Sequence, residues 1–295
     1  MRKYLDPKAD VTFKKVFGEH PNLIISLLNA LLPLPQDMQI VSIEYLSSEL
    51  VPMNPTKKDT IVDVRCKDNF NRQFIVEMQM YWTDAFFKRS VLNACKAYST
   101  QAKKGQAFET LQPVYALCLL NESGFPNYLD QDKNLEYIQE LYLINKNHPE
   151  FELQEMGLIF VELQKFKPSN YAHKKLKELW LKFLTEIKDN TTEISAELLE
   201  NKEISEALEY LETSAYTEAE LTAYDKYWDL VSREKTIINE KTNKAREEGR
   251  KEGREEGETN KAFQIAKMMK ANNEPLEKII NYTGLSKEEI EKILS

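Results

Sequence analysis

Apolar and polar residues recur along the first two thirds of the chain with two different spacings. Apolar residues three or four positions apart are typical of helices, and short alternating or continuous apolar runs are typical of strands. The predicted helices cover residues 10–18, 22–32, 84–105 and 171–187, and the predicted strands cover 39–46, 61–66, 74–80, 114–120, 135–144 and 157–163. This order of elements predicts an α/β fold in which helices cover a mixed sheet.

The long helix over 84–105 begins at the cap signal Thr83-Asp84 and ends by Gly105. Its apolar stripe, which is expected to face the core, comprises Phe87, Val91, Ala94, Cys95, Tyr98 and Ala102. Tyr98 is therefore expected to be a core residue and not a catalytic one. Near the start of the chain, Asp10 is expected to cap a first helix that ends at Gly18.

From Ser195 to Arg254 the pattern is helical and strongly charged, and Gly249, Gly253 and Gly257 recur every four residues. Glycines along one helix face permit close pairing between subunits, but each costs about 1 kcal/mol of helix stability relative to alanine. Two interpretations therefore remain open, a linker helix and a contact that forms a homo-oligomer.

Residues 275–282 and a helix that follows the capping box Ser286–Glu289 predict two short helices joined by a turn. The second helix is acidic and would repel phosphate, so a docking or oligomerisation module is expected. The expected domains are a first domain over 1–188, an acidic helical region with the glycine repeat over 189–260, and a small helix-turn-helix-like module over 261–295.

Charge is unevenly distributed along the 295 residues, which carry a net charge of −8. Residues 1–110 contain 15 Lys and Arg against 12 Asp and Glu, whereas the remainder contains 25 against 36. Binding to nucleic-acid phosphates depends on local cations. A surface for nucleic acid is therefore expected on the first domain.

Cys66, Cys95 and Cys118 lie far apart and have no neighbouring histidines, which argues against zinc and for a reducing compartment. The start of the chain lacks the apolar stretch of a signal peptide, and the apolar run over 23–32 is too short to span a membrane. A soluble, cytoplasmic protein without a membrane partner is expected.

The predicted strands 61–66 and 74–80 carry acid on the same face. If the chain turns symmetrically near Phe70, Asp63 and Glu77 become cross-strand neighbours with Cβ atoms about 5 Å apart. Carboxylates this close repel each other unless a cation lies between them, and Mg²⁺ prefers oxygen ligands. The hairpin therefore predicts a metal site, and the alternative is a solvated face of an antiparallel pair.

Ordered motifs along the chain carry a resemblance to a known family. They are Asp10-Val11-Thr12-Phe13-Lys14-Lys15-Val16-Phe17-Gly18, Leu27-Leu28-Asn29-Ala30-Leu31-Leu32, Asp63-Val64, Glu77-Met78-Gln79, Lys88-Arg89 and Tyr98. Together they resemble the Rpn family of recombination-promoting nucleases, also described as PD-(D/E)XK family transposases, strongly over residues 4–122 and again over the tail from 245. The resemblance implies a restriction-endonuclease-like fold. Val62 in place of Pro and Gln79 in place of Lys depart from the wider nuclease pattern, although the Rpn family often has this Gln.

Within this fold, Asp63 and Glu77 are expected to hold Mg²⁺ or Mn²⁺. Gln79 is expected to orient the attacking water or a phosphate oxygen. Since Gln lacks the positive charge of Lys, stabilisation of the transition state should depend more on the metal and on a second cation.

Candidates for this second, phosphate-contacting cation are Lys14, Lys15 and Arg89, and the alternative for each is plain surface charge. The resemblance suggests that Asp10 adds a further carboxylate to the site, but helix capping explains this residue equally well.

Three functions follow from these observations. The first is a Mg²⁺-dependent DNA endonuclease that hydrolyses phosphodiester bonds during recombination or mobile-element movement. The second is a catalytically weak or inactive nuclease-fold protein that binds nucleic acid or protein, which the missing Lys favours. The third is an interaction scaffold that acts through the acidic helical tail.

Overall fold

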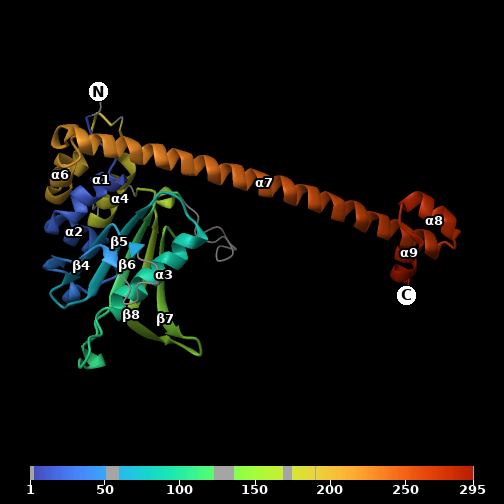
Figure 1. The fold of residues 1–295 in the computed structure, drawn as a ribbon, viewed down its shortest axis with the longest axis horizontal. Coiled ribbons are helices and arrows are strands. Elements are labelled where there is room, and N and C mark those ends of the chain that lie inside the picture. Colours follow the sequence, from blue (N-terminus) through green and yellow to red (C-terminus); the bar gives the residue numbers. More distant parts are fainter. Residues whose placement is uncertain (1–2, 51–59, 123–135, 169–174, 190, 295) are drawn as a thin grey trace. The chain divides into compact units, whose positions relative to one another are not determined.

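The computed structural model describes residues 3–50, 60–122, 136–168, 175–189 and 191–294 (Figure 1). The chain divides into two units, Met1–Val231 and Ser232–Ser295, each of which is described by itself. Across the described ranges, no helix combines the length and the apolar character needed to cross a membrane.

The first unit is built on a six-stranded mixed sheet. Its strand order is β1 (Ile43–Tyr45), β4 (Val64–Asp68), β5 (Gln73–Gln79), β6 (Val114–Leu120), β8 (His148–Glu162) and β7 (Ile138–Asn145). Neighbouring strands β5, β6 and β8 run parallel and the outer pairs run antiparallel. Every residue of β6 is buried, because parallel neighbours flank it and helices cover both faces. The predicted mixed sheet flanked by helices is confirmed.

The alternation of side chains along β5 divides its residues between two apolar clusters. Phe74 and Val76 belong to the larger cluster, whereas Ile75 belongs to the cluster under α3 (Asp84–Ser99). The helices that supply the larger cluster are α1 (Asp10–Phe13), α2 (Pro21–Leu31), α4 (Leu176–Glu186), α5 (Ala196–Glu200) and α6 (Lys202–Glu209). Glu77 and Gln79 therefore share the α3 face of the sheet with Ile75.

Segments beyond residue 188, where the first domain was expected to end, complete this core. Leu198 of α5 and Ile204 and Leu208 of α6 are buried in the larger cluster. The helical pattern expected from Ser195 is divided among several helices, since a 3-10 turn at Thr213–Ala215 separates these short helices from α7 (Glu218–Ala271).

The hairpin that carries the candidate acids has the predicted register but a shorter first strand. Val64 pairs with Val76, as a turn centred on Phe70 requires. The strand expected from Ile61 is broken, because β3 (Thr60–Ile61) pairs with β2 (Glu49–Leu50) in a separate two-stranded sheet. Asp63 therefore lies in a bend just before β4.

Helix α3 differs from its prediction in its end and in its buried face. It begins after Thr83, whose hydroxyl accepts a hydrogen bond from the Phe86 backbone N–H, and it ends at Ser99 instead of continuing to Gly105. Its buried side chains are Phe86, Ser90, Asn93, Ala94 and Ala97, whereas Cys95, expected on the buried stripe, is exposed. Tyr98 is only partly buried, and its hydroxyl donates to Glu155. The buried face of α3 is rotated relative to the predicted one, because it includes the polar residues Ser90 and Asn93, which a pattern of apolar residues does not reveal.

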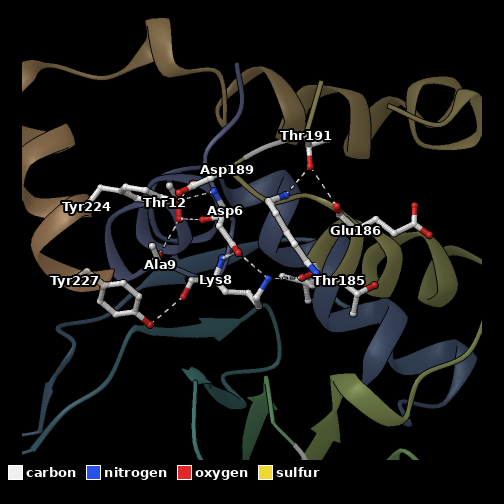
Figure 2. Close-up of polar contacts among 12 residues, drawn as sticks. Asp6, Lys8, Ala9, Thr12, Thr185, Glu186, Asp189, Thr191, Tyr224 and Tyr227 are labelled. Atoms are coloured by element: carbon white, nitrogen blue, oxygen red, sulfur yellow. Dashed lines mark hydrogen bonds and ion pairs between the residues drawn. The ribbon is translucent and has the colours of Figure 1, made fainter. Parts of the chain in front are cut away.

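A buried polar network attaches the start of the chain to α4 and α7 (Figure 2). The Lys8 ammonium lies 2.8 Å from the Asp6 carboxylate and donates to the Leu184 carbonyl at 3.1 Å. The Asp6 backbone N–H donates to the Tyr224 hydroxyl, which in turn donates to Asp189. Burial raises the pKa of Asp6, and the charge and hydrogen bonds of Lys8 oppose that rise. Residues 6–8, which immediately precede α1, are thereby fixed against α4 and α7.

The second unit, over Ser232–Ser295, confirms the expected pair of short C-terminal helices. Helices α8 (Leu276–Thr283) and α9 (Lys287–Leu294) are joined at Gly284, whose φ of 69° suits glycine. The predicted capping box forms, since the Ser286 hydroxyl accepts from the Glu289 backbone N–H at 3.2 Å and the Glu289 carboxylate accepts from the Ser286 N–H at 2.8 Å. A small apolar cluster that includes Ala266 and Ile279 holds these helices to the end of α7.

Candidate active site

Asp63 is held at the start of β4 by a hydrogen bond from the neighbouring strand. Its Oδ2 accepts from the Met78 backbone N–H at 2.7 Å, which fixes the carboxyl group against β5. Burial raises the pKa of Asp63 to about 7. The hydrogen bond from Met78 lowers this pKa, and the nearby negative charge of Glu77 raises it. The two hairpin acids therefore lie close enough to interact, as the register predicts.

Glu77 on β5 is more deeply buried, with 4% of its surface exposed. Its Oε1 accepts from the Asn93 side-chain amide at 2.8 Å, and its Oε2 lies 3.5 Å from the Arg89 guanidinium. Burial raises the pKa of Glu77, while the Asn93 hydrogen bond and the Arg89 charge lower it. Helix α3 thus supplies the two groups that favour the ionised carboxylate.

Gln79 follows Glu77 on the same face of β5 and is also contacted by Arg89. The Gln79 Oε1 accepts from the Arg89 guanidinium at 3.0 Å, and its amide nitrogen donates to the Tyr81 carbonyl at 3.0 Å. The Arg89 side chain is 45% exposed. A cation is therefore placed beside the glutamine that stands in the position of the usual lysine, and that cation is accessible to solvent.

Asp10 and Lys14 lie at the edge of this group of side chains. They form an ion pair with a separation of 2.7 Å, and each side chain is about two-fifths exposed. Both charges act on Asp63: the charge of Asp10 raises the pKa of Asp63, and the charge of Lys14 lowers it. The expectation that Asp10 caps the first helix is wrong. The helix begins at Asp10 itself, so Ala9 occupies the N-cap position, and its methyl group cannot accept a hydrogen bond. The Asp10 carboxylate is instead paired with Lys14.

Lys15, the third cationic candidate, contacts the segment just before α7 and the first turn of α7 instead. Its ammonium donates to the Ala215 carbonyl at 2.7 Å, pairs with Glu220 at 3.1 Å and lies 4.2 Å from the centre of the Tyr216 ring. The structure therefore brings Arg89 and Lys14 to the acids, but not Lys15.

The chemistry of these side chains fits a hard divalent ion. Asp63 and Glu77 provide oxygen donors, and the second carboxylate oxygen of Asp63 makes no hydrogen bond or ion pair to any described residue. Among the residues described, no group of three or more His, Cys, Asp or Glu is placed to hold an ion. Mg²⁺ in phosphoryl-transfer sites is commonly bound by one or two carboxylates, with waters and substrate phosphates as its other ligands. Two carboxylates at a partly open site suit that pattern.

Asn93 is the residue of this site that sequence reasoning missed. It is fully buried within α3 and lies four residues after Arg89, so that both side chains reach the same strand. The apolar pattern gave no signal for it, because Asn93 lies outside the predicted stripe, and its burial requires a hydrogen-bonding partner that only the fold supplies. Here that partner is Glu77.

Comparison with known proteins identifies a family. Residues 7–241 match the sequence model of a family described as PD-(D/E)XK nuclease family transposase, which covers α1, the whole sheet and the first part of α7. No curated protein and no solved structure gives a significant match.

Proposed function

Since the chain belongs to the PD-(D/E)XK nuclease family transposases, we propose that it is a metal-dependent DNA endonuclease whose active site contains Asp63 and Glu77. The observation that carries the proposal is the proximity of a partly buried and a fully buried carboxylate, both with raised pKa values, beside an exposed arginine. Buried acids are costly without a cationic partner. A divalent ion offsets that cost. We propose that the protein cuts DNA during recombination or mobile-element movement.

In this proposal, Asp63 and Glu77 hold Mg²⁺ or Mn²⁺. The bound ion supplies Lewis-acid polarisation of the scissile phosphate and a lower pKa for the attacking water. Asn93 keeps the Glu77 carboxylate oriented and ionised through its 2.8 Å hydrogen bond. The Met78 N–H orients the Asp63 carboxylate in the same way, through its own hydrogen bond.

Arg89 takes the role of the missing lysine. Its guanidinium is within 3.0 Å of Gln79 and is half exposed, so it can donate to a phosphate oxygen that enters from solvent. A planar guanidinium suits the two oxygens of a phosphate better than an ammonium does. Gln79, whose amide nitrogen is already bonded to the Tyr81 carbonyl, then positions Arg89 through its oxygen.

A second candidate function, DNA binding without efficient cleavage, is favoured by one observation. Gln79 is neutral, and Arg89 is shared between Gln79 and Glu77 instead of being directed to substrate alone. Transition-state charge would then receive less stabilisation than a dedicated lysine provides.

Incubation of supercoiled plasmid with Mg²⁺, Mn²⁺, Ca²⁺ or EDTA separates the two functions. We expect nicked or linear product with Mg²⁺ or Mn²⁺ and none with EDTA. Glu77→Gln should abolish the product, whereas the matched control Glu200→Gln, at an exposed position at the end of α5, should cut as wild type does. Plasmid that stays intact in Mg²⁺ and Mn²⁺ but is bound by the protein would support the second function instead.

A further inference from the structure

A polar hollow of about 580 Å³ opens beside α3, separate from the acids. Its cations are Arg65, Lys67 and Lys103, and most of the remainder of its lining consists of amide and hydroxyl side chains such as Gln106 and Thr110. None of the described residues that line it is acidic, although the chain has more acidic than basic residues. We refer to this hollow as the amide groove.

The amide groove lies on the same face of the sheet as the candidate active site. Gln73 is four positions before Glu77 on β5, so strand alternation directs both side chains to one face, and Arg65 of β4 donates to Gln73 from the neighbouring strand. Four residues of β5 span about 13 Å. A DNA strand that reaches the acids therefore extends over the groove within a few nucleotides.

The groove is fixed before any ligand arrives. The Arg65 guanidinium donates to the Gln73 side chain at 2.9 Å and to the Thr100 hydroxyl at 3.3 Å. Both amide atoms of Gln101 bond to the backbone of Gln112, at 2.8 and 2.9 Å, and so close the loop that forms one wall. Loss of side-chain freedom on binding is therefore small at these positions.

The cations of the groove differ in how far they are engaged within the protein. Arg65 is partly buried, and its Nε has no hydrogen-bond partner in the described part of the chain. Lys67 pairs with the exposed Glu44 at 2.9 Å. Lys103 is exposed on the loop that follows α3. Lys103 is thus the cation that an incoming anion reaches with least rearrangement.

We propose that the amide groove binds the sugar-phosphate backbone of the DNA strand a few nucleotides from the bond that is cut. The proposal rests on the proposed nuclease function. Arginine, lysine, amide and hydroxyl donors are the groups that contact phosphate oxygens, and such contacts set register without reading sequence. The groove would therefore add affinity and position the strand, and it takes no part in the chemical step.

The test compares Lys103→Glu with the matched control Lys104→Glu, the next residue, which is also exposed but does not line the groove. Binding of the full-length protein to two labelled duplexes of unrelated sequence is measured by fluorescence anisotropy in EDTA over a range of salt concentrations. Lys103→Glu should weaken binding to both duplexes about tenfold at low salt and reduce the salt slope by about 0.9. Lys104→Glu should change both quantities much less.

The possible results separate this proposal from the proposed function. The proposed role of the groove would be refuted if the Lys103 and Lys104 variants had equal affinities. It would also be refuted if the wild-type protein bound neither duplex at low salt. Weakening on one duplex alone would also overturn it, because backbone contacts are independent of sequence. If Lys103→Glu weakens binding as expected while wild type leaves plasmid uncut, the groove remains a site for the DNA backbone, whereas the nuclease function, and with it the position of the groove relative to a cut, is refuted.

Discussion

Replacement of Asp63 by asparagine should stabilise the metal-free protein at neutral and alkaline pH. Asparagine has the same shape and keeps an oxygen to accept from the Met78 N–H, so the hydrogen bond of 2.7 Å is preserved. What the substitution removes is a partly buried negative charge close enough to Glu77 to be repelled by it. Removing one member of a pair of crowded carboxylates relieves both desolvation and repulsion.

The magnitude follows from the pKa of Asp63, which rises from an ordinary 3.8 to about 7 in the folded protein. Each unit corresponds to 1.36 kcal/mol, so ionisation of Asp63 costs the folded state at most about 4 kcal/mol. Because the folded pKa is raised, the wild-type protein is relieved of this cost below pH 4 and bears it fully above pH 7. The stability difference between variant and wild type should therefore grow between pH 4 and pH 8, to about 2–4 kcal/mol.

Urea unfolding in EDTA at several pH values between 4 and 8 measures this difference. Asp37→Asn, which removes an exposed carboxylate before β1, controls for the change in net charge. Addition of Mg²⁺ should stabilise wild type and not Asp63→Asn. If the two proteins unfold at the same urea concentration at pH 8, or if wild type gains stability relative to the variant as pH rises, the reasoning is refuted.

Three further substitutions test the surroundings of the acids. Asn93→Leu removes the hydrogen bond that lowers the pKa of Glu77, so the acid limb of the cleavage rate should move to higher pH, and an unchanged pH profile would contradict this. Gln79→Lys should raise the single-turnover cleavage rate if the missing cation limits it, whereas a large fall would show that the amide is needed to position Arg89. Lys8→Ala leaves its buried carboxylate partner uncompensated and should cost about 3–5 kcal/mol in urea unfolding at pH 7, and a loss below about 1 kcal/mol would show that the ion pair is not important to the fold.

The sheet could be predicted largely because its signals are local. The continuous apolar run of β6 and the symmetric turn near Phe70 each specify an element within a few residues. The break before Asp63 could not be predicted in this way. It depends on pairing between β2 and β3 and on a hydrogen bond from the Val62 N–H to the Ser48 carbonyl, 14 residues earlier in the chain.

Candidate cations were less predictable than candidate acids. Lys14 and Lys15 are adjacent in sequence, but one is paired with Asp10 near the acids and the other with Glu220 at the start of α7. Which neighbour a lysine contacts depends on packing between segments about 200 residues apart, which no local pattern reports. The same reason explains why the contribution of α5 and α6 to the core was missed.

The location of the divalent ion is the claim on which the rest of the account depends, and iron-mediated cleavage of the polypeptide tests it most directly. Fe²⁺ bound in place of Mg²⁺ generates hydroxyl radicals, in the presence of ascorbate and peroxide, that cut the backbone near the metal. Mass spectrometry of the fragments should place the cuts near Asp63 and Glu77, and excess Mg²⁺ or the substitution Glu77→Gln should suppress them. Cuts confined to other parts of the chain, or cuts near Asp63 that persist in Glu77→Gln, would contradict the proposed site.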